Sequence, residues 1–182
     1  MRSRVATLLT AALGVAMVVG ACATTPEGTP QVTFPLTTDP PNRTTTPDLE
    51  ATRAAIAAAL GATNVILADT ESPFRPAEGA ILTTAPRAIY QAVMPADPGK
   101  GFIAVYDLED AGRAAAAAQD QAAYLASGPG RVQYPDATMH ILRQLDSTVI
   151  FYSWAPEAAV DPAAPDVAAA LETVGQAVVI PG

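Results

Sequence analysis

Hydrophobic and polar positions follow their most regular pattern near the end of the chain. The segments Thr138 to Gln144 and Thr148 to Trp154 are rich in β-branched and aromatic residues and flank the pair Asp146-Ser147. This pattern predicts two antiparallel strands joined by a tight turn. With Asp146 and Ser147 as the turn residues, opposite positions share a face in steps of two. The predicted pairs on that face are Leu145 with Thr148, Arg143 with Ile150, Ile141 with Tyr152, and Met139 with Trp154.

Four further regular segments surround this hairpin. They are a strand from Phe102 to Tyr106, an alanine-rich helix from Leu108 to Ala126 capped by Asp107, a helix from Ala164 to Gln176 and a strand from Val178 to Ile180. The order β-α-β-β-α-β is that of a ferredoxin-like split βαβ sheet, which has helices on one face only. The sequence therefore predicts an α+β fold of this kind for the second half.

The first half predicts an N-terminal α-β-α extension. Thr46 is a suitable N-cap and Pro47 a suitable first residue for a helix whose apolar face ends before Gly61. A buried strand is expected from Asn64 to Asp69, a second short strand from Ala80 to Thr84, and a short helix from Pro86 to Met94.

One face of the predicted sheet is a candidate binding face. Its six members are Phe102, Tyr106, Met139, Ile141, Tyr152 and Trp154. Two interpretations stay open. In the favoured one, the segment from Asp48 to Met94 covers this face, because that segment is long and apolar and has no other place to pack. In the other, the face is an open aromatic platform for a ligand, a partner or a second copy.

The start of the chain has the pattern of an export signal. Arg2 and Arg4 precede an apolar run from Val5 to Val19, which is shorter than the roughly 20 residues of a spanning helix. The following residues, Val19-Gly20-Ala21-Cys22, resemble the lipobox of bacterial lipoproteins. That resemblance implies cleavage before Cys22, acylation of its thiol, and attachment to the extracytoplasmic face of the cell membrane.

The expected organisation has three parts. Residues 1–21 form a cleaved lipoprotein signal peptide, residues 22–46 a Thr/Pro-rich tether, and residues 47–182 a single α+β domain. The tether contains too few apolar residues to offset the entropy of ordering it. With one cysteine in the chain, no intramolecular disulfide can form, so the domain relies on its core.

Net charge excludes one class of partner. The formal charge is −8, and loss of Arg2 and Arg4 with the signal peptide makes it −10. A chain this acidic repels nucleic acids and anionic lipid headgroups. Membrane contact is therefore expected through lipid on Cys22, and no nucleic acid is expected as a partner.

The motifs of common catalytic and metal sites are missing from the sequence. His140 is the only histidine, which excludes a catalytic triad and a multi-histidine metal site, and it is expected to be a satisfied core or edge residue. Helix ending explains Gly128-Pro129-Gly130 with Arg131 better than anion binding does. Helix capping likewise explains the acidic group Asp107, Glu109 and Asp110 better than calcium binding. No cofactor and no metal are expected.

From about Pro86 onward the chain resembles a group of short uncharacterised lipoprotein domains from GC-rich bacteria. The residues that carry this resemblance are Ala85-Pro86-Arg87-Ala88, the run from Ala122 to Val132, and Ser153-Trp154. The resemblance implies location and domain integrity and contributes no activity.

The expected function is that of a non-catalytic envelope lipoprotein whose tethered domain binds a partner protein or a small ligand. The alternative is a hydrolase of wall polysaccharide that works through two carboxylates about 5 to 10 Å apart in one cleft.

Overall fold

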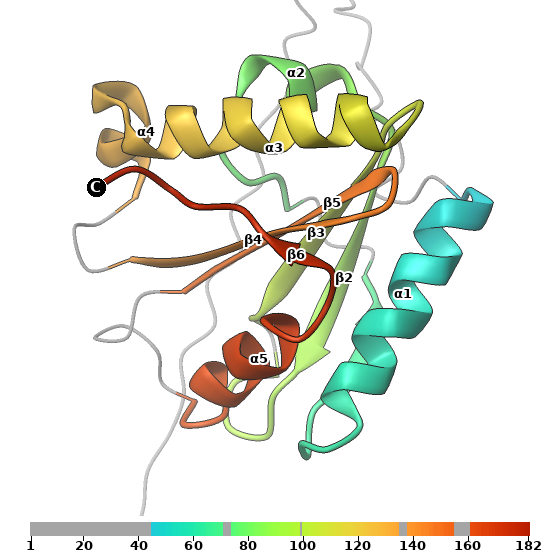
Figure 1. The fold of residues 1–182 in the computed structure, drawn as a ribbon. Coiled ribbons are helices and arrows are strands. Elements are labelled where there is room, and N and C mark those ends of the chain that lie inside the picture. The colour runs from blue at the N-terminus through green and yellow to red at the C-terminus, as the bar shows by residue number, and fades with distance from the viewer. Residues whose placement is uncertain (1–44, 71–73, 99, 135–137, 155–160) are drawn as a thin grey trace, which may run out of the picture. The chain divides into compact units, whose positions relative to one another are not determined.

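The computed structural model describes residues 45–70, 74–98, 100–134, 138–154 and 161–182. These residues form one antiparallel sheet of six strands in the order β1-β2-β3-β5-β4-β6 (Figure 1). The strands are β1 (Ile66–Asp69), β2 (Arg87–Val93), β3 (Phe102–Asp107), β4 (Met139–Leu145), β5 (Thr148–Trp154) and β6 (Gln176–Ala177). The helices are α1 (Pro47–Leu60), α2 (Ala80–Thr84), α3 (Ala111–Ala126), α4 (Gly128–Gln133) and α5 (Ala164–Leu171). The expected α+β class is confirmed.

Helices pack on both faces of the sheet. Figure 1 shows α1 and α5 on one face, with α2, α3 and α4 on the other. Each face has its own hydrophobic core, since side chains alternate along a strand. On β3, Ile103 and Val105 pack with α1 and α5, whereas Ala104 and Tyr106 pack with α2 and α3.

The two longest helices follow their sequence signals closely. α1 begins after Thr46, whose hydroxyl accepts a hydrogen bond from the Leu49 backbone N–H at 3.2 Å. α3 begins later than predicted, at Ala111, because Asp110 rather than Asp107 caps it and accepts from the Arg113 backbone N–H at 2.8 Å. The buried face of α3 is mainly alanine, at positions 114, 117, 118 and 122, so the helix lies close to the sheet.

The predicted hairpin register is confirmed. Leu145 pairs with Thr148, Met139 pairs with Trp154, and each residue of β4 between them pairs with the residue of β5 directly opposite it. Asp146 adopts a positive φ of 48°, a conformation that aspartate tolerates in tight turns. β5 lies between β3 and β4 and is antiparallel to both, so β3, α3 and β4 form one split βαβ unit.

Two details of the expected sheet are wrong. In a ferredoxin-like sheet the last strand pairs with the first, whereas here β6 pairs with β4, because β2 already occupies the free edge of β3. The helix α5 lies on the face opposite α3, so helices are not confined to one face.

Gly175 permits the turn into β6: its φ is 60°, and a Cβ there would lie 2.1 Å from the Gln144 carbonyl oxygen.

Two segments of the N-terminal extension have a different secondary structure from the predicted one. The segment predicted as a helix from Pro86 to Met94 contains the strand β2, and the segment from Ala80 to Thr84 is the helix α2 rather than a strand. β2 packs between β1 and β3 with Ala88, Ile89 and Tyr90 all buried. A strand that is buried on both faces lacks polar alternation, and its apolar positions therefore also fit a helix.

In the part of the chain that the structure describes, no helix has the length and apolar character needed to cross a membrane. Cys22, the predicted signal peptide and nearly all of the predicted tether lie outside the described residues.

Candidate functional site

A pocket of about 480 Å³ lies where β3 begins and β5 ends. We call it the sheet-end pocket. It is lined from both faces of the sheet, by the loop before α2, the loop between β2 and β3, the end of α4 and the start of α5. The lining residues are Phe74, Arg75, Pro76, Ala77, Met94, Asp97, Lys100, Gly101, Phe102, Gln133, Tyr134, Tyr152, Ser153, Trp154, Asp161 and Ala164.

Two pairs of near-parallel aromatic rings stand in the pocket lining. The Phe74 and Phe102 rings stack with centroids 4.4 Å apart and an interplanar angle of 13°. The Tyr152 and Trp154 rings stack with centroids 5.6 Å apart at 20°. Because these rings come from both faces of the sheet, the pocket is bounded by aromatic surface on two sides.

Two residues of the lining each carry a buried hydrogen-bond donor for which the described residues offer no partner. The Tyr152 hydroxyl and the Trp154 Nε1 are buried, and neither makes a hydrogen bond within the described ranges. Buried tyrosine hydroxyl and indole N–H groups usually find a partner, so two orphans in one pocket need an explanation. Burial, aided by the nearby Asp161 carboxylate, raises the pKa of Tyr152 to about 12. The phenol therefore keeps its proton at neutral pH and can donate it.

Asp161 fixes the loop between β2 and β3 to the start of α5. Its carboxylate is 3 % exposed and accepts backbone N–H bonds from Ala163 at 2.8 Å, Asp97 at 3.0 Å and Ala96. The Ala163 bond is the largest cause that lowers the pKa of Asp161, and the bonds from Ala96 and Asp97 add to it against the opposing effect of burial. Asp161 is therefore ionised, and its oxygens are used by the backbone.

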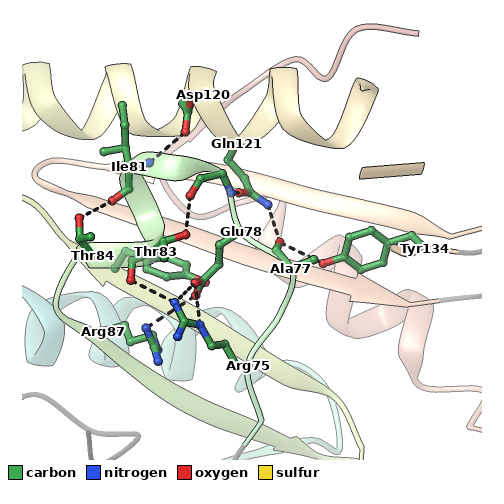
Figure 2. Close-up of polar contacts among 12 residues, drawn as sticks. Arg75, Ala77, Glu78, Ile81, Thr83, Thr84, Arg87, Asp120, Gln121 and Tyr134 are labelled. Atoms are coloured by element: carbon green, nitrogen blue, oxygen red, sulfur yellow. Dashed lines mark hydrogen bonds and ion pairs between the residues drawn. The ribbon is translucent and has the colours of Figure 1, made fainter. Parts of the chain in front are cut away.

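The loop that carries Ala77 is held by an ionic network around the buried carboxylate of Glu78, shown in Figure 2. The Glu78 carboxylate lies 2.8 Å from the Arg75 guanidinium and 3.8 Å from that of Arg87. The Tyr106 hydroxyl donates to the same carboxylate at 2.8 Å. Burial and this carboxylate raise the pKa of Tyr106 far above its ordinary value.

Gln121 on α3 secures the same loop from the helix side. Its Oε1 accepts from the Gly79 backbone N–H at 2.6 Å, and its Nε2 donates to the Ala77 carbonyl at 3.1 Å (Figure 2). The Tyr134 hydroxyl donates to that carbonyl at 3.3 Å. One wall of the sheet-end pocket is thus rigidly attached to α3, and both Glu78 and Gln121 act structurally.

The structure brings together only part of the predicted binding face. Tyr152, Trp154 and Phe102 line the sheet-end pocket. Ile141 is buried under α1 and α5, and Met139 is half exposed at the start of β4. Tyr152 and Ile141 are buried in the core under α1 and α5, so α5 as well as the segment from Asp48 to Met94 covers this part of the face.

The placement of Phe102 and Tyr106 on the predicted face is wrong. Ile103 pairs with Tyr152, and residues directly opposite in a ladder share a face. Phe102 and Tyr106 therefore lie on the opposite face, in the core under α3. Phe102 reaches the pocket only because it stands at the end of the sheet.

The other candidate residues have structural roles. His140 pairs with Ser153, which follows from the predicted hairpin register. Its Nδ1 is buried without a hydrogen-bond partner in the described structure, which differs from the expected satisfied group. Burial lowers the pKa of His140 and thereby favours its neutral form, and its ring contacts the rings of Tyr134 and Phe151. Gly128 follows the end of α3 and also begins the short helix α4, and a Cβ on Gly130 would lie 2.1 Å from the Tyr124 carbonyl oxygen.

Two acidic residues before α3 interact with its first turn. Asp110 caps the helix, and Glu109 lies 3.9 Å from Arg113. Across the described ranges, no cluster of three or more histidine, cysteine, aspartate or glutamate side chains is arranged to hold a metal ion.

Several residues of the pocket were not singled out from the sequence. The loop residues Phe74 and Ala77, the aromatic Tyr134 and the carboxylate of Asp161 come from segments far apart in the chain. Only Asp161 has a sequence signal, since an acidic residue next to Pro162 is typical of a helix start.

Comparison of the chain with protein-family models, with curated proteins and with solved structures finds no match.

Proposed function

We propose that this protein is a lipid-anchored extracytoplasmic lipoprotein whose α+β domain binds a small ligand in the sheet-end pocket. The observation that carries the binding function is a pocket of about 480 Å³ whose lining contains two stacked aromatic pairs, Phe74 with Phe102 and Tyr152 with Trp154. A pocket of this size with a mainly apolar and aromatic lining is typical of small-molecule sites.

The membrane anchor in this proposal is Cys22. Its support is the sequence Val19-Gly20-Ala21-Cys22 after a short apolar run with a basic start. Two or more acyl chains give stable attachment, since each buried CH2 contributes about 0.8 kcal/mol. The tether then leaves the domain free to reach a ligand away from the bilayer surface.

The polysaccharide hydrolase is the weaker candidate. Asp97 and Asp161 both line the pocket, so two carboxylates are present. A glycoside hydrolase, however, needs one carboxylic acid with a raised pKa to protonate the leaving group. Asp161 has a lowered pKa and three backbone N–H donors on its oxygens. It is therefore a poor general acid.

The binding function is tested by blocking the pocket. We expect small molecules that co-purify with the full chain from its own membranes, released by denaturation and identified by mass spectrometry, to be lost in Ala77→Phe, whose new ring fills the cavity. Ala51→Phe is the matched control, because Ala51 is exposed on α1. A released molecule that is equally abundant in both variants, or no bound molecule in the wild type, would contradict the proposal.

A further inference from the structure

Building on the proposed binding function, we infer that the ligand of the sheet-end pocket is a small aromatic zwitterion, a molecule with a ring body, one ammonium and one carboxylate. A free aromatic amino acid is the simplest member of this class. One unpaired acid and one unpaired base lie in the same pocket lining as two stacked ring pairs.

Two of the four charged side chains in the lining are not used by the fold. Arg75 binds the Glu78 carboxylate, and Asp161 accepts three backbone N–H bonds. Within the described residues, neither the Asp97 carboxylate nor the Lys100 ammonium makes a hydrogen bond or an ion pair. The lining therefore offers one free charge of each sign.

Asp97 and Lys100 lie on one turn between β2 and β3, and both keep accessible surface. Lys100 is exposed, Asp97 is half-buried, and both line the pocket. The Lys100 backbone N–H donates to the Asp97 carbonyl at 3.2 Å, which closes the turn. The Asp97 backbone N–H donates to the buried Asp161 carboxylate at 3.0 Å, which fixes the turn to the start of α5. The backbone positions of the two charged residues are therefore set before a ligand binds.

This pair of opposite charges selects for a ligand that carries both signs. A ligand carboxylate finds a counter-charge in Lys100, and a ligand ammonium finds one in Asp97. A ligand with a single charge gains one attractive contact and also meets a side chain of its own sign. Both contacts are attractive only for a zwitterion.

Ring surface adjoins the charged turn. Phe102 follows Lys100 and Gly101 in the chain, and its ring stacks on that of Phe74. Phe74, Phe102 and Trp154 are each partly exposed and line the pocket. Aromatic side chains favour a further ring beyond the gain from burying apolar area. The pocket volume of about 480 Å³ is in the range of small-molecule sites, so the ligand body is expected to be aromatic.

The test is titration calorimetry on the purified full chain. The probes are L-phenylalanine and L-tryptophan. Their matched controls are the N-acetyl derivatives, which lack the ammonium, and the amides, which lack the carboxylate. We expect one site per chain for at least one of the two amino acids, with both of its derivatives bound about tenfold more weakly or worse.

Two variants assign each ligand charge to one side chain. Asp97→Asn should weaken binding of the amino acid about tenfold and should not weaken binding of its N-acetyl derivative, which has no ammonium. Lys100→Gln should weaken the amino acid by a similar factor and leave its amide unaffected. Glu172→Gln and Arg131→Gln are the matched controls and should change no affinity, because both residues are exposed and lie outside the pocket lining.

Lys100 gives a second, direct readout because it is the only lysine of the chain. Reductive methylation with isotope-labelled formaldehyde marks its amine and keeps the positive charge. The NMR signal of this amine, assigned by its loss in Lys100→Gln, should shift when the amino acid is added. The shift should disappear in Ala77→Phe, whose new ring fills the cavity. An equal shift in that variant would place binding outside the pocket and overturn the inference.

Three further results would overturn the ligand class. They are no binding of either amino acid, equal affinities for an amino acid and its two derivatives, and affinities that Asp97→Asn and Lys100→Gln leave unchanged. If one of these occurs while Ala77→Phe still abolishes co-purification of a small molecule, the ligand class fails and the binding function stands. If the co-purified molecule also survives Ala77→Phe, both proposals fail.

Discussion

Thr52 on α1 and Thr148 on β5 share a buried hydrogen bond between their hydroxyl groups, 2.8 Å long and 96 residues apart in sequence. The Thr148 hydroxyl donates to the Leu145 carbonyl at 2.8 Å, so its proton is already used and Thr52 is the donor to Thr148. Nearby, the Ser147 hydroxyl donates to the Asp48 carboxylate at 2.6 Å. These contacts attach the first turns of α1 to the turn of the β4–β5 hairpin.

The direction of that bond gives a first prediction. Thr148→Val leaves the Thr52 donor buried and unpaired and should lower the free energy of unfolding by about 2 kcal/mol. Thr52→Val removes the donor and leaves Thr148 bonded to Leu145, so it should cost less, about 1 kcal/mol. Urea unfolding of both variants measures the difference. Equal costs, or a larger cost for Thr52→Val, would show that the assigned direction is wrong.

The orphaned hydroxyl of Tyr152 gives the second prediction. Tyr152→Phe should leave the free energy of unfolding of the ligand-free protein unchanged or raise it by about 1 kcal/mol, because a buried donor without a partner is removed. Tyr106→Phe is the matched comparison. It breaks a bond to the Glu78 carboxylate and should cost about 1.5 to 3 kcal/mol. A clear loss of stability in Tyr152→Phe would mean that its hydroxyl has a partner.

The third prediction concerns stability in acid. The pKa of Asp161 is lowered in the folded state, so its contribution is present above the unfolded value of about 3.9 and is lost as the pH falls toward the folded value. Asp161→Asn places an amide N–H against backbone N–H donors and should destabilise the domain at pH 7. The stability of the variant should then fall less steeply than that of the wild type below about pH 4. Parallel acid unfolding curves for the two proteins would contradict this.

Trp154 gives the fourth prediction. Its ring stacks on Tyr152 and is partly covered, and Trp154→Ala should cost about 3 kcal/mol of stability, the lower end of the range for buried tryptophan. It is the only tryptophan in the chain, so its fluorescence reports on the pocket alone. We expect weak quenching by acrylamide in the folded protein. Strong quenching with red-shifted emission would place the indole in water.

The local parts of this fold could be predicted from the sequence. The two turn residues Asp146 and Ser147 fix the pairing of every residue from Met139 to Trp154, because a two-residue turn leaves no freedom of register. Thr46, Pro47 and Gly61 likewise mark the ends of α1. Each of these signals lies in or directly beside the element that it defines.

The parts that were wrong depend on partners far away in the chain. β2 and β3 are buried on both faces, so their own residues do not indicate which face a side chain occupies. The face of Phe102 is decided by the pairing of Ile103 with Tyr152, across 49 positions of sequence. The sheet-end pocket could not be predicted for the same reason, since its lining comes from segments that only the folded chain brings together.

The alanine face of α3 has a consequence for how the sequence can change over time. Ala114, Ala117 and Ala118 are fully buried against the sheet, whereas Ala116 and Gln119 on the same helix are exposed. Larger side chains at the first three positions would separate the helix from the sheet, while almost any residue that forms helices fits the other two. Tolerance to substitution along α3 should therefore rise and fall with the helical repeat. Substitutions should therefore accumulate on the exposed side of α3, even though alanine occupies both sides of the helix.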